Sequence, residues 1–238
     1  MLSKEIARVK KITIAIDGFS SCGKSTMARD LARSVGYVYV DTGAMYRAVT
    51  LFALRNGLVD SAGKVDEAAL CAALPRVEIR FVLNESTNHP DTWLNGERVE
   101  GEIRTPLVSS RVSIVAAIPE VRAFLVAQQQ DMGREKGVVM DGRDIGTVVF
   151  PDAEMKVFVT ADASVRAARR HKELKDKGIE AHFSDILSSV KERDYADTHR
   201  AVSPLRQADD AVVLDNSDMT LEEQRQWLLT LFRERTTR

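Results

Sequence analysis

The stretch Ile12-Thr13-Ile14-Ala15-Ile16-Asp17-Gly18-Phe19-Ser20-Ser21-Cys22-Gly23-Lys24-Ser25 joins a short apolar run to a loop that contains two glycines. Gly18 is separated by four residues from Gly23-Lys24-Ser25, which is the spacing of a phosphate-binding loop. Glycines let the backbone curl so that its N–H groups point at an anion, and a helix beginning near Lys24 would add its positive end. We expect Lys24 to contact the β- and γ-phosphates of a nucleotide and the Ser25 hydroxyl to bind Mg²⁺. The alternative, a Gly-Ser turn with an exposed lysine, is disfavoured because the loop lies between a strand pattern and a helix pattern.

The size and composition of the chain exclude several classes of protein. Its 238 residues can form one sizeable core with small appended modules. The formal net charge of −1 provides no general attraction to nucleic acid or to an anionic membrane, so any anion site must be local. No apolar run is long enough to span a bilayer, and residues 12–16 are too few for a leader. We therefore expect a soluble, cytoplasmic protein with no nucleic-acid or membrane partner, and no disulfide between Cys22 and Cys71. We also expect a monomer, although composition does not determine the oligomeric state.

Short β-branched runs alternate with helical patterns in the first and last thirds of the chain. Near-continuous apolar strands alternating with helices favour an α/β fold, in which a parallel sheet is covered by helices on both faces. Ligands of such folds bind at the carboxyl ends of the strands. Thr220 and Glu223 form a capping box that starts the last helix. We expect strands at residues 12–16, 37–40, 138–140, 156–159 and 212–214, and helices at residues 25–35, 44–56, 163–176, 183–195 and 221–234.

One region interrupts this alternation. Residues 77–83 alternate between apolar and polar side chains with a period of two, and Asn95-Gly96 is the preferred turn of a β-hairpin. We expect a small antiparallel sheet inserted within residues 63–101. A helical stretch is expected from Arg104, with an interruption at Pro119.

The sequence Asp41-Thr42-Gly43-Ala44-Met45-Tyr46-Arg47 follows the second expected strand. Thr42 is a candidate N-cap, so one interpretation is simply the start of a helix. Tyr46 and Arg47 fall on the first turns of that helix, where Arg47 could bind a phosphate with two hydrogen bonds. The two interpretations are compatible, because a helix N-terminus is itself favourable for anions.

The sequence Asp141-Gly142-Arg143-Asp144 follows the strand expected at residues 138–140. A network of ion pairs within the loop is one explanation for these charges. The alternative is that Asp141 helps to hold hydrated Mg²⁺ while Arg143 and Asp144 face the molecule that accepts a phosphoryl group.

Arginines are concentrated in the region expected to form two consecutive helices. Arg166, Arg169 and Arg170 share one helix face, and a second charged group contains Arg193, Asp194, Asp197 and Arg200. Such groups are usually solvated helix faces. Beside a phosphate loop they also fit a helical lid that brings cations to a migrating phosphoryl group and excludes water.

The sequence resembles bacterial cytidylate kinases over nearly its whole length. The phosphate loop alone does not separate that family from other small kinases, but the run from Asp141 to Ala153 is long and unusually specific. The other motifs that carry the resemblance are Asp41-Thr42-Gly43-Ala44-Met45-Tyr46-Arg47, Gly101-Glu102-Ile103-Arg104-Thr105, Arg166 with Arg169-Arg170, and Lys191-Glu192-Arg193-Asp194.

The resemblance implies an enzyme that transfers the γ-phosphoryl group of MgATP to CMP and dCMP. It implies that the ATP phosphates contact Gly18, Phe19, Ser20, Ser21, Cys22, Gly23, Lys24, Ser25 and Thr26. It implies a catalytic set of Lys24, Asp141, Arg166, Arg169 and Arg170, with Ser25 and Asp141 near Mg²⁺. For the acceptor it implies Thr42, Tyr46, Arg47 and Arg143 around the phosphate, Ser113, Arg122 and Asp144 at cytosine, Arg193 and Asp197 near the ribose, and Arg200 as a further arginine.

The resemblance also implies a domain organisation. We expect a core formed by residues 1–41, 137–162 and 201–238, a monophosphate-binding domain at residues 42–136, and a lid at residues 163–200. The inserted sheet belongs to the monophosphate-binding domain.

The phosphate loop departs from many relatives in two places. Phe19-Ser20-Ser21-Cys22 stands where Pro-Ser-Gly-Ala is common, and Ser25 stands where glycine is common. Serine at that position fits the general phosphate-loop pattern, so ATP binding is still expected. Cys22 makes the loop sensitive to thiol reagents if its thiol is accessible and inert if it is buried.

Two other functions remain open at this point. A kinase for another monophosphate or a small metabolite would share the phosphate loop, and a screen of acceptors would distinguish it. A nucleotide-gated interaction protein would bind nucleotide tightly with negligible turnover. The arginines of the expected lid and the residues Asp141–Asp144 argue against the second alternative.

Overall fold

The computed structural model describes residues 10–87 and 89–237, which form two compact units. Of the described residues, the first unit comprises 10–40 and 132–237, and the second comprises 41–87 and 89–131. The sheet of the first unit has five strands in the order β2-β6-β1-β7-β8. Its strands are β1 (Thr13–Gly18), β2 (Val38–Asp41), β6 (Val138–Gly142), β7 (Met155–Thr160) and β8 (Val212–Asp215).

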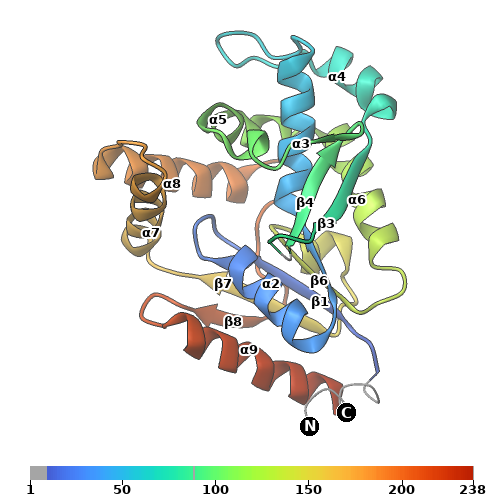
Figure 1. Cartoon of the computed structure of the whole chain (residues 1–238), viewed down its shortest axis with the longest axis vertical. Coiled ribbons are helices and arrows are strands. Elements are labelled where there is room, and N and C mark those ends of the chain that lie inside the picture. Colours follow the sequence, from blue (N-terminus) through green and yellow to red (C-terminus); the bar gives the residue numbers. More distant parts are fainter. Residues whose placement is uncertain (1–9, 88, 238) are drawn as a thin grey trace. The chain divides into compact units, whose positions relative to one another are not determined.

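Strand β1 lies at the centre of this sheet and pairs in parallel with β6 and β7 (Figure 1). All of its six residues are buried, which explains its nearly continuous apolar sequence. Ile16 lies opposite Asp141 on β6, and Gly18 lies opposite Val159 on β7. This register brings the start of the phosphate loop and the Asp141 segment to neighbouring positions at the carboxyl ends of the strands.

Helices α2 (Lys24–Val35) and α9 (Leu221–Thr236) pack against each other and against the sheet (Figure 1). Met27 and Leu31 of α2 share a buried cluster with Leu228 and Phe232 of α9. The capping box at the start of α9 is confirmed, because Thr220 and Glu223 bond to each other's backbone N–H groups. Helices α7 (Ala163–Asp176) and α8 (Phe183–His199) pack around a separate small cluster of Ala167, Ile186 and Val190.

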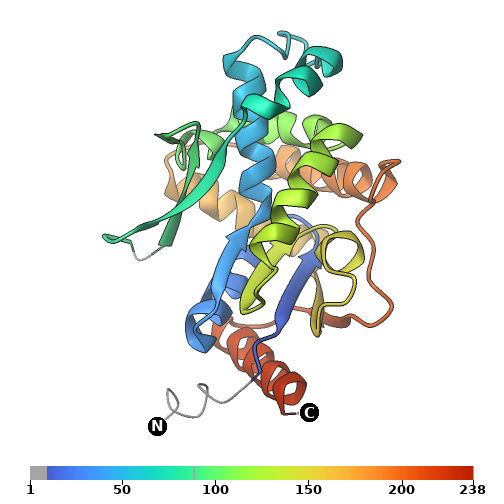
Figure 2. The same cartoon turned by 90° about the vertical axis from the view of Figure 1, so that its right-hand side faces the viewer.

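The second unit combines helices with the expected antiparallel sheet (Figure 2). Its strands pair in the order β3-β4-β5, and Asn95-Gly96 forms the turn between β4 and β5 with positive φ at both residues. The expected inserted sheet is therefore confirmed. The elements of this unit are α3 (Thr42–Arg55), α4 (Glu67–Ala73), η1 (Leu74–Arg76), β3 (Ile79–Asn84), β4 (His89–Leu94), β5 (Glu97–Arg98), η2 (Glu102–Arg104), α5 (Pro106–Val115) and α6 (Pro119–Met132).

The start of α3 differs from the expectation in one respect. Thr42 is not the N-cap but the first residue of the helix, and the N-cap is Asp41. The Asp41 carboxylate accepts a hydrogen bond from the Ala44 N–H at 2.9 Å. A carboxylate at this position also interacts favourably with the positive end of the helix, which explains why aspartate rather than threonine takes the role.

Other boundaries differ by a few residues, as is usual at element ends. Helix α8 continues to His199 rather than ending near residue 195. The helical stretch expected from Arg104 is divided into η2 and α5, because Thr105 caps a new helix that begins at Pro106. Among the described residues, no helix is both long and apolar enough to cross a membrane.

Leu228→Ala should lower the free energy of unfolding by about 2–5 kcal/mol, because truncation of a buried leucine leaves a cavity. Leu228 is 2% exposed within the cluster that joins α2, α9 and the sheet. Leu221→Ala makes the same chemical change at a side chain that is 67% exposed on the same helix. That control should change the stability by about 0.5 kcal/mol or less. Equal shifts of the two variants in urea denaturation would contradict the assignment of Leu228 to the core.

Candidate active site

The phosphate loop begins where β1 and β7 approach each other closely. Gly18 has φ +142°, and a Cβ atom at this position would lie 2.0 Å from the Val159 carbonyl oxygen. Only glycine fits there, since any side chain would displace backbone. Ser21 and Gly23 also have positive φ values, which complete the turn into α2. The N-cap of α2 is Gly23, which has no side chain to cap the first N–H groups of the helix, and an anion could take that role.

Lys24 lies inside this loop rather than on the surface. Its side chain is buried, and Nζ donates a hydrogen bond to the Phe19 carbonyl oxygen at 2.5 Å. Burial, and secondly the positive charge of Arg143, lower the pKa of Lys24 to about 7. Cys22 is fully buried, and burial raises the pKa of its thiol, which favours the inert protonated form.

Ser25 and Asp141 meet at the ends of α2 and β6. The Ser25 hydroxyl donates to Asp141 Oδ2 at 2.9 Å, and the Tyr39 hydroxyl donates to Asp141 Oδ1 at 2.8 Å. A hydroxyl and a carboxylate oxygen side by side are hard oxygen donors of the kind that Mg²⁺ prefers. The chemistry of this pair of side chains is therefore compatible with a hydrated magnesium ion.

Half-buried arginines and buried aspartates form a second group in the first unit. Arg143 Nε donates to Asp197 Oδ2 at 2.7 Å, and Arg200 Nη2 lies 3.9 Å from Asp144 Oδ1. Burial alone would raise the pKa of Asp197, but the charges of Arg143 and Arg193 outweigh it and hold the pKa below its ordinary value. These five residues were all expected at the acceptor site.

The three arginines of α7 have different surroundings. Arg166 binds both carboxylate oxygens of Asp194 at 3.0 and 2.6 Å and lies over the Phe19 ring of the phosphate loop. Arg169 donates to the side chain and the backbone carbonyl of Asn216. Arg170 instead binds Glu173 on the same helix. Arg166 and Asn216 thus tie α7 to the phosphate loop, since Asn216 Nδ2 also donates to the Cys22 carbonyl oxygen at 2.8 Å.

The acceptor residues expected on α3, α5 and α6 lie in the second unit. Arg122 is buried, with its guanidinium 5.2 Å from the centre of the Tyr46 ring. Arg47 Nη1 donates to the Ser109 hydroxyl at 2.8 Å. Thr42 is buried at the start of α3, and Ser113 is half-buried on α5. The fold thus brings Tyr46 and Arg122 together, although they lie on separate helices and are 76 positions apart in the sequence.

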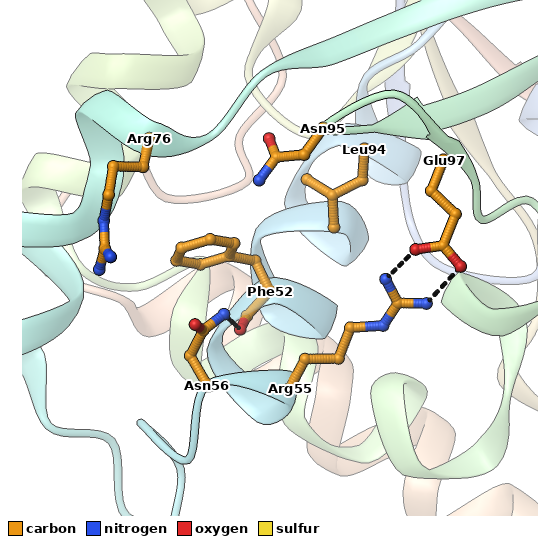
Figure 3. A pocket seen from close by; sticks show the side chains of 7 residues that line it. All are labelled: Phe52, Arg55, Asn56, Arg76, Leu94, Asn95 and Glu97. Atoms are coloured by element: carbon orange, nitrogen blue, oxygen red, sulfur yellow. Dashed lines mark hydrogen bonds and ion pairs between the residues drawn. The ribbon is translucent and has the colours of Figure 1, made fainter.

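A surface cavity of about 310 Å³ lies elsewhere in the second unit (Figure 3). It is formed by the last turn of α3 and by the hairpin turn, and it contains none of the expected site residues. Phe52 and Leu94 are apolar residues of its lining, and Arg55 pairs with Glu97 at one side.

Sequence reasoning missed three side chains that support the site: Asp17, Tyr39 and Asn216. Asp17 accepts hydrogen bonds from the Ile145 and Gly146 N–H groups. Burial raises its pKa to about 6, although the two backbone hydrogen bonds oppose the shift. A charged residue at the end of a buried strand was a usable signal for Asp17. No local pattern identifies Tyr39 or Asn216.

A parallel sheet whose central strand leads through this glycine loop into α2, with a buried lysine at the helix start, defines a P-loop kinase core. The chain belongs to the cytidylate kinase family, whose model matches residues 14–234. It is 60% identical over 224 residues to the cytidylate kinase of Bacteroides thetaiotaomicron, which covers 94% of this chain and 97% of that protein. The cytidylate kinase of Flavobacterium johnsoniae is 56% identical over 216 residues, 91% of this chain and 94% of that protein. Membership of this kinase family implies ATP as the co-substrate.

Binding of ADP should be accompanied by proton uptake near pH 8. Lys24 has its pKa lowered to about 7 in the unliganded protein, so it is mostly neutral at that pH. Negative phosphates favour the charged form, and binding should therefore take up as much as about one proton. The uptake should disappear below about pH 6, where Lys24 is already protonated.

Calorimetric titration with ADP in two buffers of different ionisation enthalpy measures this proton uptake. Lys24→Met should bind ADP with less uptake at pH 8, because methionine cannot titrate. Identical uptake by the wild type and Lys24→Met would contradict the assignment of the proton to Lys24.

Proposed function

We propose that the chain transfers the γ-phosphoryl group of ATP to CMP, and also to dCMP, to give the diphosphate and ADP. The observation that carries this proposal is the buried lysine of the phosphate loop, which lies beside the Ser25–Asp141 pair in a chain of the cytidylate kinase family. The cytidylate kinases of Bacteroides thetaiotaomicron and Phocaeicola vulgatus, each 60% identical to this chain, support CMP as the acceptor.

The ATP phosphates are proposed to bind along residues 18–26, with Lys24 on the β- and γ-phosphates. Ser25 and Asp141 would hold Mg²⁺, which neutralises charge on the phosphates when it is bound. Arg166, Arg169 and Arg170 are proposed to meet negative charge that develops during transfer. Arg166 and Arg169 already contact the loop directly or through Asn216, which supports this role.

The acceptor is proposed to bind to the residues expected from the sequence, in the roles given there. Those in the first unit are Arg143, Asp144, Arg193, Asp197 and Arg200, and those in the second are Thr42, Tyr46, Arg47, Ser113 and Arg122. The burial of Arg122 and Asp144 supports a role in base recognition, because hydrogen bonds discriminate most strongly where water is excluded.

No side chain needs to form a covalent intermediate in this reaction, since positioning and charge neutralisation accelerate phosphoryl transfer. We propose that residues 163–200 act as a lid that keeps water from the γ-phosphate, and that residues 42–136 bind the monophosphate. We also propose that the enzyme is a cytoplasmic monomer.

An ATP-coupled assay across nucleoside monophosphates tests the proposed reaction. CMP and dCMP should be the best acceptors among the common monophosphates. Preference for another acceptor would favour a different kinase activity. Tight nucleotide binding with negligible turnover for every acceptor would favour the nucleotide-gated interaction protein.

Lys24→Met should abolish phosphoryl transfer while leaving the fold intact. Methionine keeps the length of the side chain but removes the cation, so charge on the β- and γ-phosphates is no longer neutralised. The loss of kcat should reach about 100-fold or more. Lys136→Met is the matched control, because Lys136 is an exposed lysine of the same unit paired with Glu154. Near-normal turnover of a folded Lys24→Met enzyme would remove the phosphate loop from the mechanism.

Asp144→Asn should narrow the preference for CMP over UMP. The carboxylate can accept a hydrogen bond from the 4-amino group of cytosine but would face the 4-carbonyl oxygen of uracil. An unpaired buried polar group costs about 1–3 kcal/mol, so the wild type should prefer CMP by roughly tenfold to 100-fold. The amide of asparagine can turn a donor toward uracil.

The ratio of kcat/KM for CMP to that for UMP measures this effect. Asp152→Asn makes the same chemical change at an exposed residue and should leave the ratio unchanged. An equal fall of both activities in Asp144→Asn would show that Asp144 does not read the base.

A further inference from the structure

Asp17 has no role in the proposed function, yet its side chain binds the backbone of a distant segment of the chain. The residue is 5% exposed, and its two carboxylate oxygens accept hydrogen bonds from the N–H groups of Ile145 and Gly146 at 2.8 and 2.7 Å. These N–H groups belong to the first residues of η3, the short π-helix Ile145–Val149. Hydrogen bonds from N–H groups to an ionised carboxylate are among the stronger ones in proteins.

The bonds from Asp17 replace an ordinary helix cap. The first N–H groups of a helix have no partner inside it and are usually satisfied by the N-cap side chain. Asp144 is the N-cap of η3, but its side chain makes no capping hydrogen bond. Its Oδ1 atom lies instead 3.9 Å from Arg200 Nη2. Because Asp17 supplies the cap from another strand, the Asp144 carboxylate is not needed for it.

Strand pairing attaches the same segment at its other end. Asp17 on β1 lies opposite Gly142 on β6 in the parallel register. The chain from Gly142 to Gly146 is therefore fixed twice to the strand that leads into the phosphate loop, once by the sheet and once by the Asp17 carboxylate. Arg143 and Asp144 lie between the two attachments.

We propose that Asp17 is a positioning residue that sets the backbone of Arg143 and Asp144 relative to the phosphate loop. The proposal rests on the proposed function, in which these two residues bind the acceptor. Asp17 touches neither substrate in this proposal and acts only through the N–H groups of Ile145 and Gly146. Asp17 would thus connect strand β1, which leads into the phosphate loop, to the segment that contains Arg143 and Asp144. Binding of the acceptor would then depend on Asp17, whereas binding of ATP would not.

Asp17→Asn tests the proposal with little change of shape. The amide can accept from one N–H group, but its own NH₂ group faces the other, so the second attachment is lost. We expect kcat/KM for CMP to fall by about tenfold to 100-fold, in line with the cost of an unsatisfied buried group. The KM for ATP should change by about threefold or less, and the CMP-to-UMP preference should narrow.

Glu154→Gln is the matched control. Glu154 also binds a backbone N–H group of β1 with its carboxylate, from Thr13 at 2.9 Å, but at the opposite end of the strand. This variant should lower the stability of the protein and leave the kinetic constants for CMP within about twofold. A purely structural role of Asp17 would make the two variants behave alike.

Amide hydrogen exchange gives a readout that does not depend on catalysis. The Ile145 and Gly146 amides should exchange slowly in the wild type and in Glu154→Gln, and faster in Asp17→Asn.

Three results would overturn the proposal: fast exchange of these amides in the wild type, unchanged CMP kinetics in Asp17→Asn, or an equal loss of kcat/KM for ATP and for CMP in Asp17→Asn. If Asp17→Asn does not fold, Asp17→Ser serves as the second variant, because it removes the carboxylate attachments and keeps a small polar side chain. If neither folds, Asp17 is required for folding itself and the proposal is wrong. If the Ile145 and Gly146 amides of the wild type exchange slowly but the wild type does not phosphorylate CMP, the proposed function is wrong.

Discussion

Three charged side chains are buried near the carboxyl ends of β1 and β6: Lys24, Asp17 and Asp141. Burying a charge costs several kcal/mol unless it is paired or hydrogen-bonded. Each of these groups accordingly has partners: the Phe19 carbonyl for Lys24, two N–H groups for Asp17, and two hydroxyls for Asp141. The first unit therefore depends on a set of buried polar contacts at one edge of its sheet. The burial that accompanies these contacts lowers the pKa of Lys24 to about 7 in the absence of a phosphate, so that its charge responds to a bound anion.

The phosphate loop is held by elements that are distant from it in the sequence. The Arg166 guanidinium lies over the Phe19 ring, and the Asn216 amide donates to the Cys22 carbonyl oxygen. Asn216 also accepts from Arg169, so α7 and the residue that follows β8 support the loop jointly. Preorganised groups of this kind lower the reorganisation that phosphoryl transfer would otherwise require. Arg170 differs from Arg166 and Arg169, because it donates a hydrogen bond to Glu173 on its own helix and not to a residue that supports the loop.

The second unit fixes its own polar residues by a different arrangement. Asp41 caps α3 with one carboxylate oxygen and accepts from Arg104 with the other, and Arg104 also binds Glu100. Glu100 in turn accepts hydrogen bonds from the backbone and side chain of Thr92 on β4. The inserted sheet is thus connected through side chains to the start of the helix that carries Tyr46 and Arg47. The insert therefore supports the start of α3 and does not form an independent appendage.

The sequence by itself determined the features that depend on neighbours in the chain. The phosphate-loop spacing, the Asn95-Gly96 turn and the capping box of Thr220 and Glu223 are local, so their residues specify them directly. The helix and strand patterns likewise predicted the parallel sheet, and the motif from Asp141 to Ala153 indicated the family that the comparisons confirm.

Only the tertiary structure decided which distant side chains meet. Asp17 binds an N–H group 128 positions away, and Tyr39 binds Asp141 across 102 positions. The N-cap of α3 is Asp41 and not Thr42, and this also depends on tertiary structure. Asp41 is the last residue of β2, and its carboxylate accepts a hydrogen bond from the Arg104 side chain. Such pairs are created by strand order and register, which bring residues together whatever their separation in sequence. A local pattern carries no information about that register, and so the contacts that hold the site together became visible only in the folded protein.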